Sequence, residues 1–228
     1  MKNPAAGGGR WVEVPPERLI SWMVAFTDRH GPGSVSGDAA GATATFTAAD
    51  GAVAECHPPF PPLQWVGQDD PAAVAEAIVA HAVADRTVGV LLVRLGGYAI
   101  GVFTGSPPRL VSSKTGSRPV HGRSAAGGWS QHRFARRREN QAVTALRAAA
   151  DAATTIFGRH HLDALVLGGA KRSIAGLRGD PRLAPYLGLA TDRFLTVPDP
   201  RLTVLKEAPR AFLVIRIRLT EPEPDSRT

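Results

Sequence analysis

The sequence predicts an α+β (α/β-like) protein in which helices flank a mixed β-sheet. Apolar strands cluster as a meander between residues 88 and 114, a long amphipathic helix follows, and helices and strands then alternate to residue 219. Locally paired strands followed by strands separated by helices are typical of a mixed sheet with helical cover. The 228-residue chain is long enough to bury a core without disulfides, and it has one cysteine.

Residues 11–85 are predicted to form a small N-terminal α+β extension with the order helix, hairpin, helix. Apolar residues recur at helical spacing within 15–30, and residues 42–57 contain two short strands around an Ala-Asp-Gly turn. Asp70 and Pro71 suit the N-cap and the first position of a second helix. We expect this extension to precede the main domain as a separate piece of structure.

Residues 86–220 are predicted to form the main domain. Its strands are expected at 88–94, 98–104, 107–114, 162–167, 193–197 and 211–219. The polar, Gly-rich residues 1–10 are expected to be disordered, and 221–228 to form a frayed tail.

The long helix of the main domain is predicted to end near Phe157 and to have two distinct sides. One side is an apolar stripe formed by Ala135, Ala142, Leu146, Ala149, Ala153 and Ile156. The opposite side is polar and basic, and it contains Arg133, Arg136, Arg137, Asn140 and Arg147. A helix needs only one side for its core, so the arginines are expected to face solvent.

Positive charge is concentrated in one segment. The chain has a net charge of +7, and residues 109–147 contain nine Lys or Arg residues and one acid, Glu139. Charge clustered in this way indicates a polyanionic partner, most often nucleic acid. An Arg-rich composition is the alternative explanation, and it accounts for the preference for Arg over Lys but not for the clustering.

The loop before the helix contains the candidate chemical groups. Gly127 and Gly128 give the backbone conformational freedom and remove side chains, so a loop tip could enter a narrow space. Gln131 follows at the junction with the helix, and its amide can hold a water molecule against a carbonyl group. The alternative is purely structural, with a glycine hinge and Ser130 as the helix N-cap.

The segment Gly127-Gly-Trp-Ser-Gln-His-Arg-Phe-Ala-Arg136 resembles the loop and helix of the middle domain of eukaryotic and archaeal class I peptide-chain release factors. The resemblance covers residues 86–219 and implies their ribonuclease H-like fold. Trp129 stands at the position of the release factors' catalytic Gln, and Gln131 follows two residues later. This shift is similar to the Vms-type, release-factor-like peptidyl-tRNA hydrolases of ribosome-associated quality control, in particular their actinobacterial branch.

The resemblance implies hydrolysis of the ester between a stalled peptide and tRNA on the large ribosomal subunit. Gly127 and Gly128 would then shape the tip, and Gln131 would position the attacking water. The residues expected to contact RNA are Arg123, Trp129, His132, Arg133, Arg136, Arg137 and Arg147. No cofactor and no metal is expected, and the protein is expected to be cytoplasmic, without membrane contact, and monomeric.

Two other functions remain open at this point. The chain could be a non-catalytic ribosome- or RNA-binding factor, or a metal-dependent nuclease. A cysteine nucleophile is not favoured, because Cys56 and His57 are adjacent on a predicted strand and therefore point to opposite faces.

Overall fold

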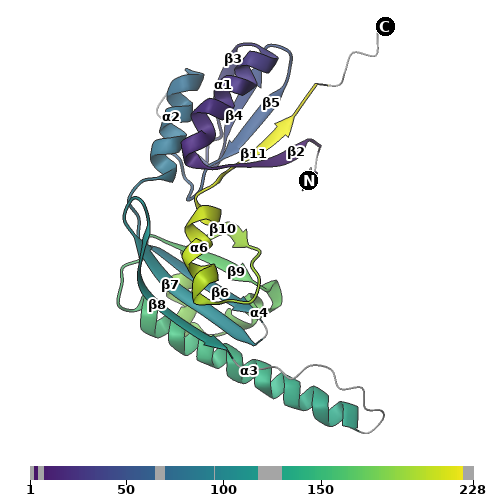
Figure 1. The fold of residues 1–228 in the computed structure, drawn as a ribbon, viewed down its shortest axis with the longest axis vertical. Coiled ribbons are helices and arrows are strands. Elements are labelled where there is room, and N and C mark those ends of the chain that lie inside the picture. Colours follow the sequence, from purple (N-terminus) through teal and green to yellow (C-terminus); the bar gives the residue numbers. More distant parts are fainter. Residues whose placement is uncertain (1–2, 5–7, 65–69, 95, 118–129, 223–228) are drawn as a thin grey trace. The chain divides into compact units, whose positions relative to one another are not determined.

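The computed structural model describes residues 3–4, 8–64, 70–94, 96–117 and 130–222, with the backbone alone for 3–4 and 130–142. The chain divides into two compact units, each with its own sheet (Figure 1). The first unit consists of residues 1–84 and 213–228, and the second of residues 85–212. The chain therefore begins in the first unit, builds the second, and returns to complete the first.

The first unit contains an antiparallel six-stranded sheet with the strand order β1-β2-β11-β5-β4-β3. The strands are β1 (Asn3–Pro4), β2 (Arg10–Val14), β3 (Gly33–Gly37), β4 (Ala44–Ala48), β5 (Val53–His57) and β11 (Ile215–Thr220). β4 and β5 form the hairpin that the sequence predicts, and Gly51 adopts a positive φ of 87° at its turn.

Two helices pack on one face of this sheet. A 3-10 turn (Pro16–Arg18) leads into α1 (Leu19–His30), and α2 (Pro71–Ala82) follows the hairpin. The Asp70 side chain accepts hydrogen bonds from the N–H groups of Ala72 (3.2 Å) and Ala73 (3.3 Å), so the predicted N-cap is present. Alternate residues of the strands, such as Phe46 and Ile217, join both helices in one buried core.

Two features of the first unit differ from the expectation. Strand β11, expected within the main domain, lies between β2 and β5, where Ile217 is opposite Val12 and Cys56. Its alternate apolar side chains complete the core of the first unit. Asn3 and Pro4, expected to be disordered, pair with β2; residues 1–2, 5–7 and 223–228 lie outside the described part of the chain.

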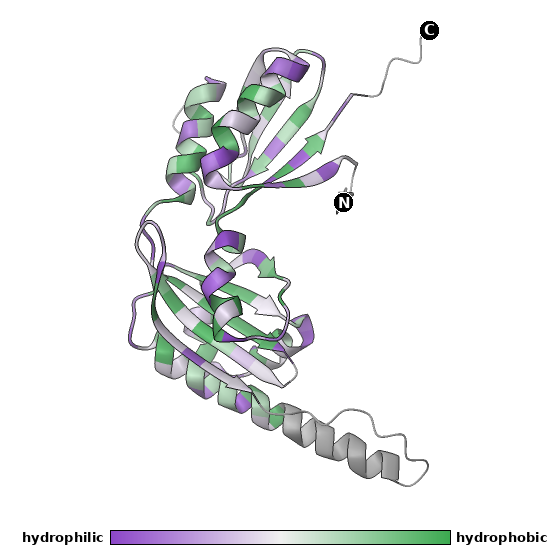
Figure 2. Ribbon diagram, in the orientation of Figure 1, coloured by the Kyte–Doolittle hydropathy of each residue, from purple (hydrophilic) through white to green (hydrophobic). Residues whose placement is uncertain are grey.

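The second unit contains a five-stranded mixed sheet with the order β10-β9-β6-β7-β8. Its strands are β6 (Val88–Arg94), β7 (Gly97–Thr104), β8 (Arg109–Ser117), β9 (Ala164–Gly169) and β10 (Ala190–Leu195). β6, β9 and β10 are parallel, whereas β6, β7 and β8 form an antiparallel meander. The predicted mixed sheet is therefore confirmed, and Figure 2 shows hydrophobic residues along its central strands.

Helices cover both faces of this second sheet. The helices are α3 (Ser130–Phe157), α4 (Lys171–Leu177), the single turn α5 (Ala184–Leu187) and α6 (Leu202–Phe212). α3 and α4 share a core with Leu91 and Leu165, whereas α6 packs on the opposite face, with the Phe212 ring 5.9 Å from that of Phe103. α6 is absent from the sequence prediction, which instead begins a strand at Ala211.

Candidate functional site

The basic segment begins on an edge strand and continues into α3. Arg109 and Lys114 are exposed on β8, which pairs only with β7 among the described strands. Arg147 is exposed on α3, as the two-sided helix predicts. Three exposed cations on two elements of the second unit therefore flank the part of the segment whose side chains the structure does not describe.

Ser130 is the first residue of α3, which places Gln131 and His132 in its first turn. Arg133, Arg136 and Arg137 follow on the next turns of the same continuous helix. Only the backbone of these residues is described. Four of the predicted site residues, Arg123, Gly127, Gly128 and Trp129, lie outside the described part of the chain.

The second half of α3 is firmly embedded in the unit. Ala149, Ala153 and Phe157 are completely buried, and Ile156 is nearly so. Small alanine side chains let a helix approach a sheet closely. The predicted apolar stripe is confirmed from Leu146 onward, while the side chains of its other members, Ala135 and Ala142, lie outside the described part of the chain.

An arginine clamp, which the sequence analysis missed, ties α3 to a neighbouring turn. Arg182 Nη1 lies 2.7 Å from Oδ1 of Asp151 on α3, and Arg182 Nη2 lies 2.7 Å from Oδ2 of Asp180. The hydrogen bond from Arg182 holds the pKa of Asp180 below its ordinary value. The only sequence signal is Asp180-Pro181, a helix-start pair like Asp70-Pro71.

The length of α3 separates its buried base from its first turn. Leu146 is the first α3 residue that packs against the core among those with described side chains. At about 1.5 Å per residue, Ser130 lies roughly 24 Å from Leu146 along the helix axis. A continuous helix of this length, fixed at one end, can carry a polar amide and a row of arginines to a distant target.

Other predicted or possible sites receive no support. Cys56 is completely buried, and burial raises the pKa of its thiol, which suppresses the reactive thiolate. Within the described residues, no group of three or more His, Cys, Asp or Glu side chains is placed to hold a metal ion. None of the helices in that same part of the chain is long and apolar enough to cross a membrane.

Comparison with known families identifies the chain. Residues 86–218 match the model of the Actinobacteria/chloroflexi VLRF1 release factor family. This match covers the sheet of the second unit, α3 and the helices around it, and it ends within β11. The class is that of release-factor-like proteins, which places the chain among proteins of translation. The chain belongs to the actinobacterial and chloroflexi VLRF1 release factor family.

Solved structures show only distant similarity. An archaeal translation termination factor, aRF1, is 14% identical with a TM-score of 0.36, over 87% of this chain and 62% of its own. The Vms1 mitochondrial localization core is 12% identical with a TM-score of 0.35, over 80% and 77%. Dom34 of S. cerevisiae is 9% identical with a TM-score of 0.32, over 93% and 68%. The chain thus spans about three fifths of the archaeal factor. No curated protein matches it.

Proposed function

We propose that the protein is a peptidyl-tRNA hydrolase that releases stalled nascent chains from large ribosomal subunits in the cytoplasm. The observation that carries the proposal is the position of Gln131 in the first turn of a long helix whose far end is buried in the core. Membership of a release factor family supports the same activity. The proposed partners are the large subunit and peptidyl-tRNA, and the proposed state in solution is a monomer.

The proposed chemistry depends on positioning. An amide cannot act as a base near neutral pH, but it can donate to and accept from a water molecule at the same time. Gln131 would hold water beside the ester carbonyl, while Gly127 and Gly128 keep the approach free of side chains. Holding a reactant in the correct geometry lowers a reaction barrier by several kcal/mol, so a neutral amide that positions water can accelerate the hydrolysis.

The arginines are proposed to bind RNA. Arg133, Arg136, Arg137 and Arg147 would contact tRNA or ribosomal RNA phosphates, where a planar guanidinium binds two oxygens at once. Arg123 and His132 would add contacts near the tip. Trp129 would stack on a nucleobase. The backbone N–H dipoles at the start of a helix also favour an anion. No acidic residue of α3 lies before Glu139 to oppose this effect.

The direct test compares Gln131→Ala with the wild type on purified large subunits that hold peptidyl-tRNA. We expect peptide release to fall about a hundredfold or more, the range seen when one polar stabilising group is removed. Gln141→Ala, the same change on the same helix, is the matched control and should retain wild-type release.

Ribosome binding is measured in the same samples by co-sedimentation. The proposal expects both variants to bind like the wild type. Full release by Gln131→Ala contradicts the assigned mechanism. Binding without release by any form, including the wild type, supports a non-catalytic ribosome-binding factor instead, a role that Trp129 at the usual catalytic Gln position makes worth testing.

A further inference from the structure

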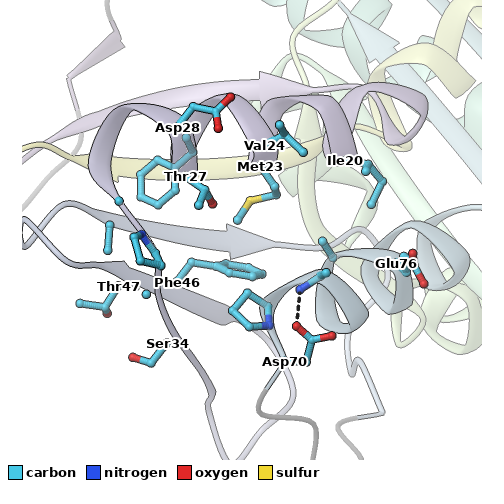
Figure 3. Close-up of a pocket in the computed structure, with 18 residues that line it drawn as sticks. Ile20, Met23, Val24, Thr27, Asp28, Ser34, Phe46, Thr47, Asp70 and Glu76 are labelled. Carbon is cyan, nitrogen blue, oxygen red and sulfur yellow. Dashed lines mark hydrogen bonds between the residues drawn. The ribbon is translucent and has the colours of Figure 1, made fainter.

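A groove of about 400 Å³ opens in the first unit between α1, α2 and the β3–β4 hairpin (Figure 3). Its floor and walls are apolar. Met23 of α1 and Phe46 of β4 face one another across it, and Ala75 of α2 also lines it. None of these residues belongs to the helix or the loop that the proposed function uses.

Two large apolar side chains of α1 line this groove and remain exposed. Ile20 is 41% exposed and Val24 is 56% exposed, one helical turn apart. Exposed apolar side chains that rim a concave apolar surface indicate a binding site more often than isolated ones do. A groove walled by two helices suits an apolar helical segment, which inserts side chains spaced at i, i+3, i+4 and i+7.

The ionisable residues that line the groove are all acidic. Asp28, Asp70 and Glu76 are the ionisable residues that line it, and no Lys, Arg or His lines it among the described residues. All three are exposed, and Asp70 also caps α2. The chain as a whole carries +7, so an acidic rim is a local departure. Such a rim repels RNA and attracts a cationic partner.

We propose that this groove binds a basic amphipathic protein segment that forms a helix with apolar residues on one face and Lys or Arg on its flanks. The apolar face would insert between α1 and α2 over Met23 and Phe46. The cationic flanks would pair with Asp28 and Glu76. The groove shares no residue with the proposed hydrolase site, so variants can change one set without changing the other.

The test uses a fluorescent amphipathic peptide with leucines at i, i+3, i+4 and i+7 and lysines at the flanks, together with a twin in which glutamates replace the lysines. The full chain should bind the lysine peptide about tenfold or more tightly than the glutamate twin in fluorescence anisotropy. Added salt should weaken binding of the lysine peptide, because exposed ion pairs are screened.

Matched variants locate the binding site. Val24→Lys should weaken the lysine peptide about tenfold or more, whereas Val83→Lys should not change binding. Val83 is 39% exposed in the same unit and does not line the groove. The double variant Asp28→Lys/Glu76→Lys should reverse the preference between the twins. All the changed side chains are exposed, and thermal unfolding of each variant verifies its fold.

Several results would overturn the proposal. They are absence of peptide binding, equal affinity for both twins, and indifference of binding to Val24→Lys. Self-association of the wild type that Val24→Lys abolishes would assign the groove to a second copy of the chain. Peptide release from ribosomal subunits is measured separately, and its loss in Gln131→Ala leaves the groove proposal untouched.

Discussion

At the scale of single residues, His57 shows how partial burial on a sheet changes the pKa of a side chain. Its ring is half-buried on β5, 5.1 Å from the ring of Trp11. Its Nε2 lies 2.7 Å from Oε1 of Glu55. Burial outweighs the attraction of this carboxylate and lowers the pKa of His57 below its ordinary value.

This shift predicts a loss of stability under mildly acidic conditions. Because the pKa is lower in the folded state, the unfolded chain takes up a proton first as the pH falls below about 6.5. The contribution of His57 to the free energy of unfolding is therefore complete above that pH, and it is lost as the pH falls through the pKa of the folded state. Urea unfolding at about pH 7.5 and about pH 5.5 measures this loss.

The variant His57→Gln has no imidazole to titrate and should lose less stability between these two pH values. The pKa values of Asp38 and Asp50 are lowered, mainly by backbone hydrogen bonds, and so move further away from this pH range. An equal fall in wild type and variant would show that His57 is not responsible.

An interaction between residues could be predicted from the sequence when its partners lie close together in the chain. Asp70 and its two N–H donors are within three residues, so the N-cap could be predicted. Arg182 and Asp151 are 31 residues apart, and only folding brings them together. The described residues around Gln131 are limited to backbone, so its predicted role remains a prediction.

At the scale of elements, α3 is held by its buried second half. Phe157 is completely buried, and its ring lies 5.4 Å from that of Tyr186. Phe157→Ala should reduce the free energy of unfolding by about 3–5 kcal/mol, because it removes apolar packing and leaves a cavity. Urea denaturation provides the measurement.

Val143→Ala is the control on the same helix, since Val143 is 47% exposed. It should change the free energy of unfolding by no more than about 0.5 kcal/mol. A similar loss of stability in both variants would mean that α3 is not anchored at its buried end.

Helices and strands with a strong hydrophobic pattern could be predicted from the sequence, whereas those with a weaker pattern could not. The alternating and continuous apolar runs of β6 and β7 and the amphipathic stripe of α3 correspond to observed elements. α6 was not predicted, and Pro209 lies inside it, where a proline is unfavourable. Its buried Leu205, Ala208 and Phe212 lie at helical spacing, which was the available signal.

At the scale of the whole molecule, the path of the chain decides which pieces can fold alone. β11 is a central strand of the first sheet, where it lies between β2 and β5. Along the sequence, however, the entire second unit separates it from both of these strands. Its alternating apolar pattern identifies a strand but not its partners, because pairing is a long-range property. The sequence therefore predicted the strand and assigned it to the wrong sheet.

Fragments test this arrangement. Residues 85–212 contain every strand and helix of the second unit and should unfold cooperatively when produced alone. Residues 1–84 lack β11, so β2 loses its link to the rest of the sheet, and this fragment should not unfold cooperatively. Circular dichroism during heating distinguishes the two. Cooperative unfolding of 1–84 would contradict the role given to β11.

The charge distribution predicts salt-sensitive binding to RNA. Replacing Arg133, Arg136 and Arg137 together by Gln should weaken binding to tRNA and reduce the slope of log affinity against log salt by roughly 0.7–0.9 for each phosphate that is no longer neutralised. Replacing Arg159, Arg172 and Arg178, which lie outside the 109–147 segment, is the charge-matched control. Equal effects of the two triple variants would show that net charge, and not this helix, governs binding.

The most direct test of the central claim is the identity of the products formed from peptidyl-tRNA on large subunits in ¹⁸O-labelled water. Hydrolysis of the ester predicts intact deacylated tRNA and a peptide with one labelled oxygen in its new carboxyl group. A peptide still attached to a nucleotide would indicate cleavage of the tRNA, and unreacted peptidyl-tRNA would indicate no catalysis. Either result would contradict the proposed hydrolase.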